Sequence, residues 1–356
     1  MANKVFLETH NLKNRAGGLG TFNYELIKGL AQINHDGIEL TLNVQDPESL
    51  RAEFGDRFRY RKYSSLTRHS LFRIREKYDL WHSVNQNTKV EPARVSKYLL
   101  TVHDVNFAEE PGDKSAELHR LFKDKLARAT AITYISEFAK LQAHSHFDIP
   151  DVPQYVIYNG NPISTLRDVS SYRPTVPVDR PFLYSIGDFL ERKNFLSLVK
   201  MMPLLPDFNL VISGNHDKPY GRQIQQFITD NGLQDRVFLT GKVDDTAKQY
   251  FYANCRAFVF PSIREGFGLP PIEAMAFGKP VFLSDKTSLP EIGGDHAYYW
   301  THFDPEYMSA EIARGLAHFQ ANKHQMETHM KNRAASFDWK VAAQQYLDVY
   351  RDLLSR

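Results

Sequence analysis

Two glutamates, Glu265 and Glu273, lie eight positions apart in the stretch REGFGLPPIEAMAFG. Gly266 and Gly268 follow the first of them, and glycine allows a backbone to approach a ligand closely. A pair of carboxylates can accept hydrogen bonds from the paired hydroxyl groups of a sugar. Taken singly, Glu265 would be a solvated loop charge, and Glu273 a charge stabilised in the first turn of a helix. The combination favours a ligand site.

Two cationic residues, Arg192 and Lys193, follow the strand-like segment FLYSIG, which ends at Gly187. They fall in a turn, because the next helical pattern begins near Asn194. A leaving diphosphate needs cationic stabilisation, and Arg and Lys can provide it where no metal does. Exposed turn charges are the alternative interpretation.

The first half of the chain adds further candidates. Gly17 and Gly18 precede a predicted helix, whose N-terminal N–H groups favour anions. A dinucleotide-binding fingerprint is excluded, because Asn23 stands where its third glycine should be. His103 and Asp104 end the buried segment LLTVHD, where a lone histidine is more often structural.

Composition narrows the class of protein. At 356 residues the chain suits two domains of roughly 150 residues each. A net charge of +2 does not indicate nucleic-acid binding. The single cysteine, Cys255, excludes an intrachain disulfide and fits a reducing compartment. No signal peptide and no apolar stretch of about 18 residues is found, so we expect a soluble, cytoplasmic protein.

Apolar runs alternate with helical patterns along the chain, which indicates βαβ units and parallel sheets. Strands are predicted at KVFLE, IELTLNV, KYLLTVHD, TAITYIS, FLYSIG, FNLVISG, RVFLTG, RAFVFPS and KPVFLSD. Residues 159–181, rich in Ser, Thr, Pro and Asp, indicate a linker between two doubly wound domains. Ligands bind beyond the carboxyl ends of such strands, and two such edges facing each other would form a cleft.

The stretch EGFGLPPIE resembles the Glu-x7-Glu motif of the family 4 retaining glycosyltransferases, which have the GT-B fold. The similarity extends over the interior GFGLPPIEAMA. It implies that Glu273 holds the nucleotide ribose and that Glu265 faces the hydroxyls of the donor sugar. It also implies that backbone amides of the loop between them reach the sugar and the phosphates.

Other motifs are similar to those of the family. Arg192 and Lys193 match its element that stabilises the leaving phosphate, although Asp188 stands where many members have arginine. The first glycine-rich loop resembles the one that lies against the donor phosphate and sugar. The pair His103 and Asp104 resembles an element whose histidine lines the reaction centre.

The resemblance implies a set of site residues and a mechanism. The catalytic residues would be His103, Arg192, Lys193 and Glu265, and the substrate-binding residues Gly17, Gly18, Asp104, Gly187, Gly266, Phe267, Gly268, Leu269 and Glu273. Transfer would proceed on one face of the sugar with retention, and the leaving phosphate would take the proton of the acceptor. No metal or other cofactor is expected. Asp-x-Asp, HExxH, CxxC, GxSxG and Walker A patterns are absent.

The resemblance covers nearly the whole chain and is weakest over residues 35–95. It implies an α/β GT-B fold. An acceptor domain would span 1–165 together with a C-terminal helix, 339–356, that crosses back to it. A sugar-nucleotide domain would span 166–338.

The expected function is transfer of a hexose, mannose or glucose, from a nucleoside-diphosphate sugar to a glycan or lipid-linked acceptor. Cell-envelope polysaccharide or lipopolysaccharide biosynthesis is the expected process. Two alternatives stay open. One is another GT-B enzyme, such as a nucleotide-sugar epimerase or a phosphorylase, and the other is a non-catalytic sugar-nucleotide binding protein.

One segment, residues 57–77, has a strong local excess of basic side chains. They are Arg57, Arg59, Arg61, Lys62, Arg68, Arg73, Arg75 and Lys77, interleaved with Phe58, Tyr60, Tyr63, Leu71, Phe72 and Ile74. In one interpretation the segment is a solvated face whose aromatic side chains pack inward. In the other it contacts anionic lipid on the inner face of the membrane, or a phosphorylated, lipid-linked glycan. Nucleic acid is disfavoured, because the rest of the chain is not basic.

Overall fold

The structure is a computed structural model that describes residues 2–15, 17–109 and 112–356. It divides into two compact units, Met1–Pro162 with Asp338–Arg356 and Ile163–Phe337. The sequence predicts the end of the first segment at 165, three residues later than observed. It predicts the start of the C-terminal segment at 339, one residue later than observed.

The first unit is built on a seven-stranded sheet of order β3-β2-β1-β4-β5-β6-β7, in which all neighbouring strands are parallel. The strands are β1 (Asn3–Leu7), β2 (Ile38–Val44), β3 (Arg59–Lys62), β4 (Leu80–Ser83), β5 (Tyr98–Val102), β6 (Ala131–Tyr134) and β7 (Gln154–Val156). Its helices include α1 (Gly18–Ala31), α2 (Pro47–Phe54), α3 (Asp113–Leu126), α4 (Glu137–His146) and α12 (Trp339–Ser355). The central strands β4, β5 and β6 are buried along their whole length, as in sheets covered on both faces.

The second unit has a six-stranded parallel sheet of order β10-β9-β8-β11-β12-β13. The strands are β8 (Phe182–Ile186), β9 (Asn209–Ser213), β10 (Val237–Gly241), β11 (Ala257–Phe260), β12 (Val281–Ser284) and β13 (Tyr298–Trp300). Its helices include α5 (Phe195–Met201), α6 (Pro219–Asp230), α7 (Asp245–Asn254), α8 (Leu269–Ala276), α9 (Leu289–Gly293), α10 (Pro305–Ala321) and α11 (Lys323–Ala335). Among the described residues, no helix combines the length and the apolar character needed to cross a bilayer.

Each sheet has one point at which the strand order reverses. This switch point lies between β1 and β4 in the first sheet and between β8 and β11 in the second. In open α/β sheets ligands bind outside the carboxyl ends of the strands at such a point. The loops that follow β1, β4, β8 and β11 are therefore where the fold itself favours a site.

The strands predicted from the apolar runs are confirmed, while β3, β4, β7 and β13 were not anticipated. These four strands are only three or four residues long. Strands β3, β7 and β13 lie at sheet edges, where short and polar strands are common. Polar residues interrupt β3 (RYRK), β4 (LWHS) and β7 (QYV), and β13 (YYW) has only three residues, so no apolar run stands out in them.

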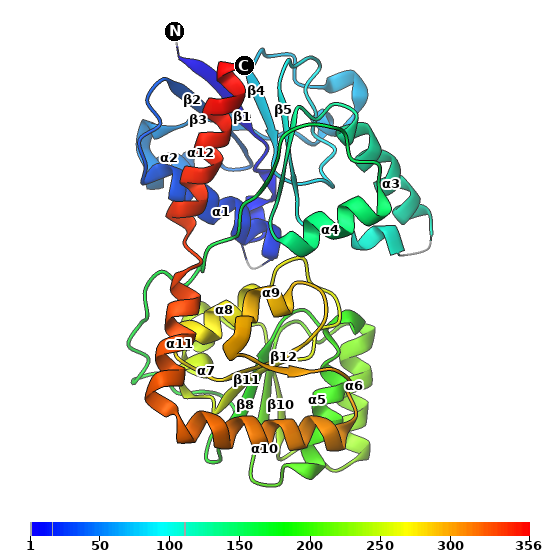
Figure 1. Cartoon of the computed structure of the whole chain (residues 1–356), viewed down its shortest axis with the longest axis vertical. Helices are drawn as coiled ribbons and strands as arrows, with labels where there is room; N and C mark the ends of the chain where they lie inside the picture. Colours follow the sequence, from blue (N-terminus) through cyan, green and yellow to red (C-terminus); the bar gives the residue numbers. More distant parts are fainter. Residues whose placement is uncertain (1, 16, 110–111) are drawn as a thin grey trace. The chain divides into compact units, whose positions relative to one another are not determined.

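The C-terminal helix α12 belongs to the first unit, as the resemblance implied, and lies beside α1 (Figure 1). The contact is close, since a Cβ atom on Gly29 of α1 would lie 2.6 Å from the carbonyl oxygen of Trp339. The Tyr350 hydroxyl lies 2.7 Å from Nδ1 of the fully buried His82 on β4. Burial lowers the pKa of His82 to about 3, so this link joins two neutral groups.

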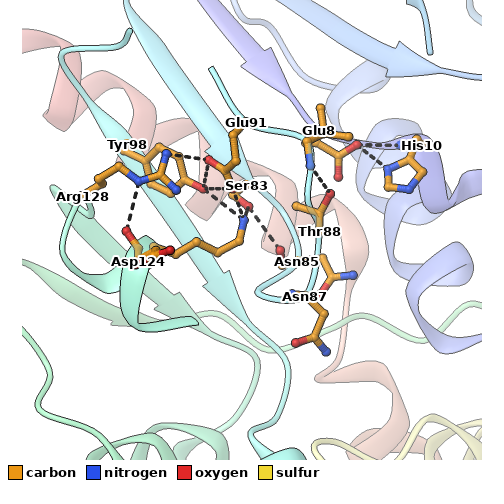
Figure 2. Close-up of polar contacts among 12 residues, drawn as sticks. Glu8, His10, Ser83, Asn85, Asn87, Thr88, Glu91, Tyr98, Asp124 and Arg128 are labelled. Atoms are coloured by element: carbon orange, nitrogen blue, oxygen red, sulfur yellow. Dashed lines mark hydrogen bonds and ion pairs between the residues drawn. The ribbon is translucent and has the colours of Figure 1, made fainter. Parts of the chain in front are cut away.

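A buried charged cluster fixes the loop after β4 (Figure 2). The ammonium of Lys125, which is fully buried, donates to Glu91 at 2.5 Å and to Ser83 at 2.8 Å. Arg128 forms an ion pair with the other carboxylate oxygen of Glu91 at 2.9 Å, and the Tyr98 hydroxyl lies 3.0 Å from both oxygens. The start and the end of the segment 83–91 are thus tied to α3 and β5.

We expect Lys125→Met to destabilise the first unit, because it leaves Glu91 buried with only Arg128 as an ionic partner. Removing one member of a buried ion pair typically costs about 3–5 kcal/mol. The measurement is the urea midpoint of unfolding, with Lys123→Met, an exposed position of the same helix, as control. Equal midpoints for the two variants would contradict this account, and Lys125→Met/Glu91→Leu should recover part of the loss.

Candidate active site

The turn after β8 carries the predicted cations. A short 3-10 helix, Glu191–Lys193, follows the strand, and Asn194 adopts a left-handed conformation (φ 53°) before α5 begins. Lys193 is only 8% exposed. A Cβ on Gly187 would lie 3.5 Å from Cε of Lys193, so the glycine lies directly against the stem of the lysine. The turn thus directs a buried ammonium to the carboxyl end of the sheet.

The loop after β11 supplies the partner of that ammonium. Glu265 Oε1 lies 2.5 Å from Nζ of Lys193 and accepts a 2.6 Å hydrogen bond from the Ser262 hydroxyl. Arg192 approaches the other oxygen at 3.6 Å and donates to the Arg264 carbonyl at 3.0 Å. Burial alone would raise the pKa of Glu265, but the two cations and these hydrogen bonds hold that pKa below its usual range. The carboxylate is therefore ionised at neutral pH.

The glycine-containing loop is held by its backbone. The Glu265 N–H donates to the Thr287 hydroxyl at 3.1 Å, and the Ser288 hydroxyl lies 3.0 Å from the Glu265 carbonyl and 2.5 Å from that of Phe267. Gly268 has a φ of 124°, which disfavours other residues, and caps α8, which begins at Leu269. The loop is thus pre-shaped by α9 and by the start of α8.

Glu273 lies in the second turn of α8, whereas the sequence placed it in the first. It is 6% exposed, and its oxygens lie 3.1 Å from Nζ of Lys248 and 2.7 Å from the Tyr252 hydroxyl. Burial alone would lower the pKa of Lys248, but Glu273 raises that pKa overall. A carboxylate offers about four acceptor positions, so the two bonds orient Glu273 and leave capacity for a ligand.

The first glycine-rich loop starts α1 in the other unit. Gly17 is the N-cap residue and provides no side-chain cap. Gly20 is required by packing, because its Cβ would lie 1.8 Å from the carbonyl oxygen of Asn14. A Cβ on Gly18, by contrast, would meet no atom of the described residues within 4 Å, so packing against them does not require a glycine there.

His103 follows β5 and is 7% exposed. Its Nε2 donates to the Val84 carbonyl at 2.8 Å, and its ring meets Phe22 edge-on. Burial lowers the pKa of His103 to about 4, and the Val84 contact only partly opposes this, so the ring is neutral near pH 7. Gln86 holds the adjacent backbone: it accepts from the His103 N–H at 3.1 Å and donates to the Asp104 carbonyl at 2.7 Å.

The structure thus brings Arg192, Lys193 and Glu265 together, and it ties Glu273 of α8 to two residues of α7. Gly17, Gly18, His103 and Asp104 belong to the first unit. Asp188, the departure from the family pattern, is paired with Lys218 at 3.0 Å. Within the described residues, no group of three or more His, Cys, Asp or Glu side chains is arranged to hold a metal ion. Metal independence stays a prediction.

Several supporting residues escaped the sequence analysis. Lys248 and Tyr252 are four positions apart on α7, a spacing that places them on one helix face and could have suggested a common partner. Ser262 directly follows the proline after β11, again at a strand end. Gln86 had no signal of this kind, since a single glutamine in a loop is unremarkable.

The apolar side chains of the basic segment 57–77 fall into two groups, one buried and one exposed. Phe58 and Ile74 are 3% and 2% exposed and pack inward, as one interpretation expected. Leu66, Leu71 and Phe72 are 55%, 80% and 53% exposed, at two short 3-10 turns, Ser65–Arg68 and Ser70–Phe72. Of the eight basic residues, only Arg59 forms an ion pair with another described residue, Glu39 at 3.1 Å.

Comparison with known proteins agrees with this geometry. O-antigen chain mannosyltransferase B of Escherichia coli is 25% identical, over 98% of this chain and 99% of its own length. Sucrose-phosphate synthase from Thermosynechococcus elongatus has the same fold (TM-score 0.76, 20% identity, 99% of both chains). So does Anabaena Alr3699/HepE, solved in complex with UDP and glucose (TM-score 0.72, 17% identity, 99% of this chain and 100% of that one).

Two family models match consecutive parts of the chain. The model for glycosyltransferase family 4 matches residues 16–164, and the model for glycosyl transferases group 1 matches residues 169–337. The chain belongs to the family 4 glycosyltransferases of GT-B fold.

Proposed function

We propose that this glycosyltransferase moves a hexose from a nucleoside-diphosphate sugar to a glycan or lipid-linked acceptor, with retention of anomeric configuration. The observation that carries the proposal is the Lys193–Glu265 pair beside the loop 266–269, at the switch point between β8 and β11. The second unit would bind the sugar nucleotide and the first unit the acceptor.

The charges in this cluster suit a leaving diphosphate. Lys193 and Arg192 bring two positive charges, and Glu265 removes one of them, so a net cation remains to attract the phosphates. The bond from the anomeric carbon to the phosphate oxygen breaks, and its electron pair goes to the diphosphate. The acceptor oxygen bonds to that carbon, and its proton goes to the leaving phosphate. Preorganised cations lower the barrier because they need not reorient as charge develops.

Glu265 and His103 have complementary roles in this proposal. The ionised Glu265, fixed by Ser262 and Lys193, would orient the hydroxyls of the donor sugar. His103 would line the oxocarbenium-like centre, and its neutral ring adds no positive charge against it. Glu273 would hold the ribose through the acceptor positions that Lys248 and Tyr252 leave open.

The names of the relatives guide the choice of substrate. One relative that spans 98% of this chain is an O-antigen chain mannosyltransferase, which supports mannose as donor sugar and lipopolysaccharide biosynthesis as the process. The HepE complex supports a nucleoside diphosphate as the donor and glucose as the alternative sugar.

We place the protein at the cytoplasmic face of the membrane, in peripheral contact through residues 57–77. Leu71 and Phe72 are exposed and form an apolar tip, and Arg68 and Arg73, which are exposed too, flank them in the sequence. Each basic residue near an anionic surface contributes roughly 1 kcal/mol, and burial of a Leu or Phe side chain about 1.5–3 kcal/mol.

If Glu273 grips the ribose, Glu273→Gln should weaken binding of a nucleoside diphosphate by roughly tenfold or more, since hydrogen bonds to charged groups contribute about 1.5–3 kcal/mol. Glutamine keeps the size of the side chain, so the packing against α7 is largely preserved. Calorimetry with UDP and GDP and their 2′-deoxy and 3′-deoxy forms measures this. One of the deoxy forms should bind the variant and the wild type alike. An unchanged dissociation constant for the ribonucleotides would refute the assignment.

Lys193→Met should lower turnover about a hundredfold or more, because one preorganised charge for the leaving diphosphate is lost. Affinity for the free nucleoside should change little. The measurement is product formation with UDP-glucose and GDP-mannose, and Lys200→Met, an exposed lysine of α5, is the matched control. Near-normal turnover in Lys193→Met would mean that the diphosphate is held elsewhere.

The membrane contact predicts co-sedimentation with phosphatidylglycerol vesicles that weakens as salt rises. Leu71→Ser/Phe72→Ser should reduce the bound fraction, because the apolar tip is lost. Leu141→Ser, an equally exposed leucine on α4, should not. If the wild-type protein co-sedimented with neither anionic nor neutral vesicles, the segment would have no role in membrane binding.

A further inference from the structure

The switch point of the first sheet carries a polar pair that the donor chemistry does not use. Glu8 directly follows β1 and is fully buried, and its Oε1 lies 2.5 Å from Nδ1 of His10. Figure 2 shows the carboxylate pointing toward the imidazole ring. The ring of His10 also stacks on Tyr63, with centroids 4.5 Å apart and planes 8° apart. The imidazole is therefore fixed both in its plane and along one edge.

This arrangement leaves one nitrogen of His10 available. In the tautomer that donates from Nδ1 to the carboxylate, the ring presents Nε2 as an acceptor on the opposite edge. Nε2 forms no hydrogen bond with any described residue, and the side chain is 13% exposed. The buried carboxylate orients the ring, and the second ring nitrogen is left to form a hydrogen bond with a ligand.

Two further hydrogen-bond acceptors without a partner lie on the loops that follow β1 and β4. The second carboxylate oxygen of Glu8 is buried without a hydrogen-bond partner among the described residues. The same holds for the side-chain oxygen of Asn87, in the loop after β4. A buried polar atom without a partner costs about 1–3 kcal/mol, so atoms of this kind indicate a missing donor. Both of these oxygens are closed to solvent, whereas Nε2 of His10 belongs to a partly exposed side chain and is the acceptor that a ligand can reach.

The charge of Glu8 selects against a phosphate. Its carboxylate lies directly behind His10 and would repel an anion placed at Nε2. Glu8 also acts on the Lys125 ammonium, whose pKa it tends to raise, but Lys125 forms its ion pair with Glu91. A neutral hydroxyl, which donates to Nε2, meets no such repulsion. The site therefore differs in kind from the cationic cluster of the second unit.

We infer that Glu8 and His10 form a binding site for a hydroxyl group of the sugar acceptor, with Nε2 of His10 receiving the hydrogen bond. The inference rests on the proposed function, because it assigns the acceptor to the first unit. His10 lies in the segment between β1 and α1, and Gly17 and Gly18 stand at the start of that helix. Glu8 and Tyr63 are positioning residues that fix the plane and the tautomer of the ring.

The first test observes binding without turnover. In protein labelled with 15N-histidine, octyl α-mannoside and octyl α-glucoside should shift the ring signals of His10, identified by their loss in His10→Phe. Phenylalanine keeps the stack on Tyr63 and removes both nitrogens. The inference would be overturned if neither glycoside changed the chemical shifts of the His10 ring while the protein still bound a nucleoside diphosphate. The proposed function would be unaffected by that result.

The second test separates transfer to the glycoside from hydrolysis of the donor, in which water is the acceptor. With GDP-mannose or UDP-glucose, His10→Ala and His10→Phe should lower the ratio of transfer to hydrolysis by about tenfold or more, the loss of one hydrogen bond of about 1.4 kcal/mol. His35→Ala is the matched control, a histidine of the same unit that also stacks on an aromatic ring, Phe58. An unchanged ratio in both His10 variants would overturn the inference. Wild-type protein that binds neither UDP nor GDP would instead overturn the proposed function.

Discussion

The ion pair between Lys193 and Glu265 is the constraint on which the second unit depends. Lys193 is buried and the Glu265 side chain is only 12% exposed, so either charge would be costly without the other. The turn after β8 and the loop after β11 must therefore stay together. Further contacts join the same two segments, since the Arg192 carbonyl accepts from the Ile263 N–H at 2.8 Å and lies 3.1 Å from the Ser262 hydroxyl oxygen. The same contacts that stabilise the pair also shape the candidate donor site.

The two units use one topology for opposite chemistry. At the switch point of the second sheet, two cations lie beside one carboxylate, which suits the phosphates of the proposed donor. At the switch point of the first sheet, Glu8 and Asn87 have acceptor atoms without a partner among the described residues, and the histidine after β5 is neutral. In the proposed function one sheet edge would serve an anion and the other the hydroxyl groups of a sugar. A transferase that joins a charged donor to a neutral sugar needs both.

The sequence predicts those parts of the fold and site that local patterns encode. The apolar strands and the helix that begins near Asn194 depend on neighbouring residues, and they lie where expected. The partners of Glu273 and His103 could not be predicted from local patterns, because Lys248, Tyr252 and Gln86 come from other segments of the chain. The basic segment shows the same limit: composition identified it, but only burial separates Phe58 and Ile74, which face inward, from Leu71 and Phe72.

The return of α12 to the first unit has a consequence for synthesis of the chain. Residues 163–337, which form the second unit, are made before this helix emerges from the ribosome. At about 5–20 residues per second, those 175 residues take roughly 9–35 s. Throughout that interval the face of α1 that meets Trp339, and the imidazole of His82 that meets Tyr350, lack their cover. The half of the protein that begins first is therefore completed last.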